Sequence, residues 1–168
     1  MMHRDADVDF RITRTFNAPR ELVFKTMTET EHLQHWWGPK GCRTEVATHA
    51  PRPGGLFHYC LHFLGGFDMW SRFVYREIVA PERIVYVNGF ADAEGNAAPN
   101  PMRPNWPMEM LITTTLTEQD GKTVLSLVSQ PINATELERA NFLAGHASIQ
   151  GGFGGMYDQY EAYLAKLA

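Results

Sequence analysis

The stretch from Thr135 to Leu167 constrains the fold more than any other part of this chain. It begins with Thr135-Glu136-Leu137-Glu138, the spacing of a capping box, in which a threonine hydroxyl accepts a hydrogen bond from the backbone N–H three residues later. Apolar residues then recur three or four positions apart, which predicts one buried face of a long α-helix. The members of this stripe are Phe142, His146, Ile149, Phe153, Met156, Tyr160, Leu164 and Leu167.

Five glycines lie inside this predicted helix: Gly145, Gly151, Gly152, Gly154 and Gly155. Each costs about 1 kcal/mol relative to alanine in a helix interior. A helix that keeps so many glycines therefore gains something from the missing side chains. Two explanations remain open: another backbone packs very close to the helix, or room is left above this face for a ligand.

Composition limits the class of protein. The chain has 168 residues, of which 44% are hydrophobic and 20% charged, as expected of one globular domain, and we expect a single domain over residues 1–168 with a flexible tail at 1–7. A net charge of −4 and the absence of a basic cluster argue against nucleic-acid binding. No stretch has the apolar character of a signal peptide or a membrane span, and the two cysteines are too few for a disulfide framework. We therefore expect a cytoplasmic protein with reduced thiols.

Alternating apolar and polar residues predict antiparallel strands, in an order that indicates an α+β fold. A first strand covers 10–16, two short helices follow Pro19, and about six further strands precede the long helix. The expected strands after the helices are 43–48, 57–63, 69–79, 84–90, 108–116 and 123–129. Residues 91–105 contain three prolines and no periodicity, so we predict a long loop that acts as a flap over a cavity.

Several segments together resemble a known family. They are Phe16-Asn17-Ala18-Pro19-Arg20-Glu21-Leu22-Val23-Phe24, Trp36-Trp37-Gly38-Pro39, Pro53-Gly54-Gly55, Glu77-Ile78-Val79-Ala80-Pro81-Glu82-Arg83-Ile84, Thr123-Val124-Leu125-Ser126-Leu127 and Gly151-Gly152-Phe153. From Val8 to Leu167 the chain resembles the domain related to the activator of heat-shock protein 90 ATPase, within the START/Bet-v-like SRPBCC superfamily. The resemblance implies a helix-grip fold, in which a curved antiparallel sheet of about six or seven strands wraps a long C-terminal helix and encloses a mostly apolar cavity.

The resemblance implies several functions rather than one. Members of this superfamily bind lipids, sterols, polyketides or plant hormones, some are cyclases or hydrolases, and one branch assists a chaperone. The eukaryotic chaperone activators carry an additional large N-terminal domain. Because the similarity here begins close to residue 1, we expect that domain to be absent, which weakens the chaperone hypothesis.

The residues themselves favour no catalytic or metal chemistry. His58, Cys60 and His62 share one face of a strand, but positions four apart in a strand lie roughly 13 Å apart, too far for two histidines to share one ion. No nucleophile elbow, cysteine–histidine signature or phosphate-binding loop is present. We therefore expect no catalytic residues, no metal site and no cofactor.

Aromatic and methionine residues suggest a binding cavity instead, because they bury large, adaptable surfaces. The candidates for its lining are Trp37, Phe57, Tyr59, Leu61, Trp70, Phe90, Trp106, Met108, Met110, Phe142, His146, Ile149 and Phe153. His146 is either a hydrogen-bonded core histidine or a polar contact for the ligand. We expect a small apolar molecule as the partner, no nucleic acid or membrane, and a monomer or homodimer. A chaperone-associated interaction protein and a cavity-based enzyme acting on an aromatic or polyketide-like compound are the alternatives.

Overall fold

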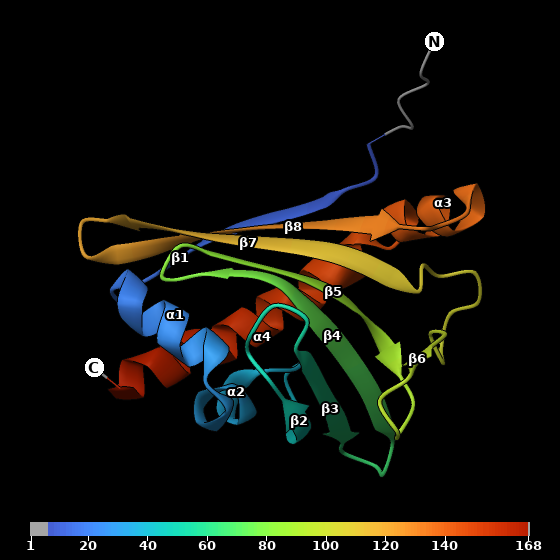
Figure 1. Cartoon of the computed structure of the whole chain (residues 1–168), viewed down its shortest axis with the longest axis horizontal. Coiled ribbons are helices and arrows are strands. Elements are labelled where there is room, and N and C mark those ends of the chain that lie inside the picture. The colour runs from blue at the N-terminus through green and yellow to red at the C-terminus, as the bar shows by residue number, and fades with distance from the viewer. Residues whose placement is uncertain (1–6, 168) are drawn as a thin grey trace.

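One antiparallel sheet curves around one long helix in the computed structural model, which describes residues 7–167 (Figure 1). The elements in chain order are β1 (Phe10–Phe16), α1 (Arg20–Thr28), α2 (Thr30–Trp36), β2 (Cys42–His49), β3 (Leu56–Phe63), β4 (Asp68–Val79), β5 (Arg83–Ala91), β6 (Ala97–Ala98), β7 (Glu109–Gln119), β8 (Lys122–Ile132), α3 (Glu136–Ala144) and α4 (His146–Leu167).

The strand order of the sheet is β1-β8-β7-β5-β4-β3-β2, and the short β6 pairs with β5. The two ends of the sheet curl toward α4, which lies across its concave face (Figure 1). Register shifts interrupt the pairing of β2 between Val46 and Thr48 and that of β4 between Tyr75 and Glu77. Such bulges bend a strand and increase its twist, and they help the sheet to curve.

The predicted α+β helix-grip architecture is confirmed, including the two short helices after the first strand. The sheet has one more strand than we expected, because β6 forms within residues 91–105. Of the predicted flexible tail at residues 1–7, all but Asp7 lies outside the described residues. No helix in the described part of the chain is long and apolar enough to cross a membrane.

The prediction of one continuous helix from Thr135 to Leu167 was wrong in one respect. The capping box is present, with the Glu138 N–H donating to Thr135 Oγ1 over 3.1 Å and the Thr135 N–H donating to Glu138 Oε1 over 2.8 Å. Gly145 then ends α3, and α4 begins at His146. A Cβ atom at position 145 would lie 2.8 Å from the ring of Trp106, so the break is also a point of close packing.

The C-terminal half of α4 is held by a buried aromatic cluster around Tyr160. Its ring stacks on Trp36 with the centroids 3.9 Å apart and meets Phe16 edge-on at 4.9 Å. The Tyr160 hydroxyl lies 2.6 Å from Thr26 Oγ1 and donates to the Val23 carbonyl over 3.0 Å. Because every buried polar atom in this set has a partner, the cluster fixes α4 against α1, α2 and β1.

The N-terminal half of α4 is held differently, by contacts to β1 and the residues before it. Phe153 stacks on Phe10 with the centroids 5.9 Å apart. His146 donates from Nε2 to the Val8 carbonyl over 2.8 Å, between the rings of Phe10 and Phe142. His146 is thus a hydrogen-bonded structural histidine, the first of the two roles predicted for it.

At most of the glycines of α4, no other part of the protein packs closely against the helix. A Cβ atom on Gly151, Gly152 or Gly154 would have no neighbour within 4 Å, and one on Gly155 would meet only Lys40 at 3.8 Å. The explanation of close backbone packing therefore fails at these four glycines, and at Gly145 the close neighbours are the side chains of Trp106 and Arg103.

The first half of the predicted flap lies against the convex face of the sheet, opposite α4. His58 on β3 donates from Nε2 to the Asp92 carbonyl over 3.0 Å. Arg72 on β4 donates to the Gly95 carbonyl over 2.8 Å. These contacts hold residues 92–95 away from the concave face, so only the later residues of the segment reach toward it.

We expect Gly151→Ala and Gly152→Ala to stabilise the protein by up to about 1 kcal/mol each, because both positions are helical and open. Gly145→Ala should instead destabilise it, by about 1–3 kcal/mol, because the new methyl group would overlap Trp106. Urea denaturation of the three variants measures both effects. Destabilisation by the alanines at 151 and 152 would contradict the open environment.

His49 at the end of β2 gives the stability a pH dependence. Its Nδ1 lies 2.7 Å from Thr30 Oγ1 and its Nε2 2.8 Å from the Tyr75 hydroxyl, and burial lowers its pKa from 6.5 to about 4. Between these two pH values the unfolded chain binds a proton that the folded chain does not, so the free energy of unfolding should fall as the pH decreases from 6.5 to 4. His49→Gln should show a shallower decrease across this window in melts at matched pH values; an unchanged slope would exclude His49 as its source.

Candidate functional site

A partly open cavity of about 170 Å³ lies between the concave face of the sheet and the first half of α4. Its walls come from five strands, from α3 and α4, and from the end of the loop before β7. The lining residues are Tyr59, Ser71, Asn88, Gly89, Phe90, Trp106, Met110, Ile112, Ser129, Phe142, Ile149 and Phe153. Six of them are buried, namely Tyr59, Ser71, Met110, Ile112, Ser129 and Phe142, whereas Asn88, Gly89, Phe90, Trp106, Ile149 and Phe153 are half-buried.

The cavity brings together many of the side chains predicted from the sequence. The predicted residues that line it are Tyr59, Phe90, Trp106, Met110, Phe142, Ile149 and Phe153. They come from five different elements and one loop end, so only the fold makes them neighbours.

The other predicted candidates lie elsewhere. Phe57 and Leu61 are buried in the core of the sheet, and Trp37 packs against Phe57 and Phe73 deeper along the concave face. Trp70 lies on the convex face, where its ring stacks on His58 with the centroids 4.8 Å apart. Met108 is 41% exposed, and His146 serves the structural role described above.

Polar side chains form the floor of this otherwise apolar cavity. Tyr59 and Ser71 are directly opposite each other on β3 and β4, and Ser71 is opposite Phe90 on β5. Asn88 faces Met110 across β5 and β7, and Ser129 faces Ile112 across β7 and β8. Side chains opposite each other on one face of a sheet have Cβ atoms about 5 Å apart, so the Tyr59 and Ser71 hydroxyl-bearing side chains are direct neighbours, whereas Asn88 and Ser129 are each flanked by apolar residues.

Asn88 contributes the least satisfied of these polar groups. Its Oδ1 is buried and has no hydrogen-bond partner among the residues that the structure describes. An unpaired buried polar group costs about 1–3 kcal/mol. A carbonyl oxygen in this state, at the wall of a cavity, is an acceptor that a bound molecule can use.

Tyr59 is the one ionisable side chain among the described residues that line the cavity. Burial raises the pKa of its hydroxyl, while the side chains of Trp37 and Ser71 act in the opposite direction. The phenol is therefore neutral at physiological pH. The cavity offers neutral donors and acceptors, and none of the described residues 7–167 places a carboxylate, imidazole or amine at its lining.

A second, much smaller hollow of about 20 Å³ continues deeper along the same face. Tyr86, Thr114 and Leu127 line it, and each lies two residues from a lining residue of the larger cavity on the same strand. Burial raises the pKa of Tyr86 well above its ordinary value, so this end is also uncharged. Its volume suits about one water molecule.

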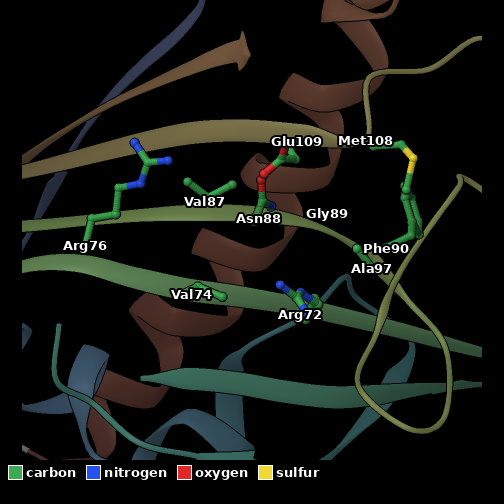
Figure 2. Close-up of a pocket in the computed structure, with 10 residues that line it drawn as sticks. All are labelled: Arg72, Val74, Arg76, Val87, Asn88, Gly89, Phe90, Ala97, Met108 and Glu109. Atoms are coloured by element: carbon green, nitrogen blue, oxygen red, sulfur yellow. The ribbon is translucent and has the colours of Figure 1, made fainter. Parts of the chain in front are cut away.

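A different hollow of about 240 Å³ lies on the convex face (Figure 2). Figure 2 shows Arg72, Val74 and Arg76 along β4, with α4 passing behind the sheet, and Phe90 and Met108 pointing toward each other at one end. This hollow is a surface depression lined by long charged side chains and by several short ones. The cavity on the concave face has buried walls and is the better candidate for a binding site.

Sequence reasoning missed five residues of the cavity, namely Ser71, Asn88, Gly89, Ile112 and Ser129. Strand alternation gave a signal for four of them: Asn88 and Ile112 each lie two residues from a predicted cavity residue, and Ser71 and Ser129 each lie two residues from an apolar residue of the same strand. Ser71 precedes Phe73, and Ser129 follows Leu127, so alternation places both hydroxyls on the apolar face. A polar residue on the apolar face of a strand indicates a cavity, and this indication was overlooked.

A curved sheet that grips a long C-terminal helix, with a cavity between the two, defines a helix-grip domain of the START/Bet-v-like SRPBCC kind. The family model described as activator of Hsp90 ATPase homolog 1-like protein matches residues 17–165, and the chain belongs to this family. No curated protein matches the sequence.

Solved structures share the fold over nearly the whole chain. A solution structure of a protein from Arthrobacter aurescens is 24% identical, with a TM-score of 0.79 over 96% of this chain and 90% of that one. A crystal structure of a Mycobacterium smegmatis protein is 25% identical, with a TM-score of 0.75 over 94% of this chain and 90% of that one. The AHSA1 protein of Silicibacter pomeroyi is 17% identical, with a TM-score of 0.71 over 95% of this chain and 99% of that one.

We expect Asn88→Leu to raise the free energy of unfolding by about 1 kcal/mol or more, because leucine removes the unpaired oxygen and keeps a similar volume. Asn141→Leu is the matched control: its amide donates to the Asn105 carbonyl over 2.9 Å, so its loss should destabilise the protein slightly. Chemical denaturation of both variants without added ligand makes the comparison. Destabilisation by Asn88→Leu would mean that Oδ1 has a partner.

Proposed function

We propose that this protein binds a small, mostly apolar molecule with one polar hydrogen-bond donor in the cavity between the sheet and α4. The observation that carries the proposal is the unpaired Asn88 Oδ1 beside an apolar lining. An unpaired polar group at a cavity wall lowers the stability of the free protein. Such a group is typical of a binding site, since function and stability compete there.

The size of the cavity limits the ligand. An engineered protein cavity of about 150 Å³ holds benzene, so a cavity of about 170 Å³ suits a single ring with a small substituent. Drug-sized molecules occupy pockets of about 300–1,000 Å³. Larger lipids or polyketides would therefore need the cavity to widen.

The chemistry of the lining limits the ligand further. Trp106, Phe142 and Phe153 supply aromatic surface along the helices, whereas Ser71 and Asn88 supply hydrogen-bonding groups on the sheet. A ring bearing a hydroxyl or N–H group would place its apolar part against the helices and donate to Asn88 Oδ1. A charged group would enter without a counter-charge, which is unfavourable in a buried site.

The residues that line the cavity support binding without catalysis. General acid–base catalysis needs a titratable group with a pKa near the working pH, and Tyr59 has a raised pKa. The chaperone alternative would need a contiguous apolar surface. The large exposed apolar side chains are instead spread over separate elements, with Leu64 and Phe67 at the β3–β4 turn and Leu137 and Leu143 on α3.

We expect phenol to bind more tightly than toluene, which has nearly the same size but no donor. A hydrogen bond to Asn88 Oδ1 contributes about 0.5–1.5 kcal/mol, so the difference in Kd should be roughly two- to tenfold. Asn88→Leu should remove this preference and leave toluene binding intact. Titration followed by amide chemical shifts in NMR spectra measures these weak affinities.

Ile149→Trp tests whether phenol and toluene bind in this cavity, because the larger side chain should fill it and abolish binding of both compounds. Leu143→Trp is its control, since Leu143 is 47% exposed on α3. Equal affinities for phenol and toluene would contradict the role of Asn88. Unchanged binding in Ile149→Trp would contradict the site itself.

A further inference from the structure

Three potential metal ligands converge on the convex face of the sheet, opposite the cavity. Cys60 and His62 lie two residues apart on β3, and Asp68 begins β4 directly opposite His62. Cys60 Sγ, one ring nitrogen of His62 and a carboxylate oxygen of Asp68 all lie within 4.8 Å of one another. His62 Nδ1 is 4.0 Å from Cys60 Sγ and 2.7 Å from Asp68 Oδ1.

Carboxylates engage both ring nitrogens of His62. Asp68 Oδ1 lies at Nδ1, and Glu45 Oε2, from the neighbouring strand β2, lies 2.8 Å from Nε2. A neutral imidazole carries a hydrogen on only one nitrogen, so it can donate to only one of the two carboxylates. The arrangement is complete when the ring is protonated, or when a metal cation occupies the Nδ1 side and Nε2–H donates to Glu45.

The arrangement with a metal cation also gives Cys60 a role, as a ligand. Protonation of the His62 ring alone does not involve Cys60. We propose that Cys60 Sγ, His62 Nδ1 and Asp68 Oδ1 bind one Zn²⁺ ion, with Glu45 orienting His62 from its far side. A carboxylate that accepts from the non-ligating N–H of a zinc-bound histidine is a recurrent feature of zinc sites. Here Glu45 is already in hydrogen-bonding position.

The geometry suits zinc after a small adjustment. Tetrahedral bonds of about 2.0–2.3 Å place neighbouring ligand atoms about 3.5 Å apart, so Sγ must approach Nδ1 slightly and Asp68 must move back from it. Cys60 is buried, whereas the Asp68 side chain is 54% exposed and can move freely. A thiolate and an imidazole together favour zinc over magnesium or calcium.

The charges around the site and its exposure to solvent also fit a zinc ion. With the thiol proton released to water, the thiolate and the carboxylates of Asp68 and Glu45 carry three negative charges. Zn²⁺ and Arg43, which is directly opposite His62 on β2, carry three positive charges. Three protein ligands leave a fourth position for water on the exposed side, as in zinc sites that bind substrates.

The experiment is a titration of the metal-free, full-length chain with Co²⁺, which adopts zinc geometry and reports its ligands by absorption. We expect one equivalent to give visible bands of tetrahedral cobalt and a near-ultraviolet thiolate-to-cobalt band, both lost when Zn²⁺ is added. Cys60→Ser should remove the near-ultraviolet band, and Asp68→Asn, at an exposed position, should weaken binding without disturbing the fold. Glu45→Gln should keep the band and weaken the affinity about 10–100-fold.

Cys42→Ser is the matched control, because the other thiol donates to the Pro39 carbonyl and lies outside this cluster. Its cobalt spectrum should equal that of the unchanged protein. The proposal is overturned if no thiolate band forms, which would leave an ion-pair network only. It is also overturned if the band survives in Cys60→Ser or if Asp68→Asn and Glu45→Gln bind cobalt as tightly as the original chain.

Discussion

The attachment of α4 through Tyr160 is the contact on which the rest of the structure depends. Stacking on Trp36 and hydrogen bonding to Thr26 and Val23 fix one half of the helix against α1 and α2. The other half is held at the edge strand β1 through Phe153 and His146, and the cavity lies between it and the inner strands of the sheet. The cavity is the space that this unequal packing leaves, and it exists without any need for the glycines to provide it.

The two faces of the sheet have different chemistry as a result. On the concave face, where α4 excludes water, Tyr59, Ser71 and Asn88 are neutral and depend on hydrogen bonds for compensation. On the convex face, water and opposite charges allow ionised groups such as Glu45 and Asp68 to collect around His62. Strand alternation separates these two environments by the thickness of a single strand.

The fold was largely predictable from the sequence because it rests on local patterns. The alternation in 10–16 and the capping box at Thr135 each act within a few residues, and each was found in the structure. The break at Gly145 was not predicted, because it depends on Trp106, a residue 39 positions away in the chain. The helical pattern on both sides of the break gives no sign of that contact.

The candidate site was predictable only in part, for the same reason. Phe142, Ile149 and Phe153 were identified because they share one helical stripe, whereas Trp70 was misplaced when hydrophobicity was given more weight than strand alternation. The cluster at His62 was overlooked because the search followed one strand. Its carboxylates come from the two neighbouring strands, and their register is set by pairing that the sequence does not state.

Gly89 has a consequence for how the concave cavity can change shape. It lines both the concave cavity and the hollow of Figure 2, and a Cβ atom there would lie 2.2 Å from the Met108 carbonyl oxygen. The partition between the two hollows is therefore a bare stretch of backbone at this point. Substitutions of Met108 or its neighbours on the outside would press on that partition and alter the shape of the interior, while every side chain that lines the concave cavity stays the same.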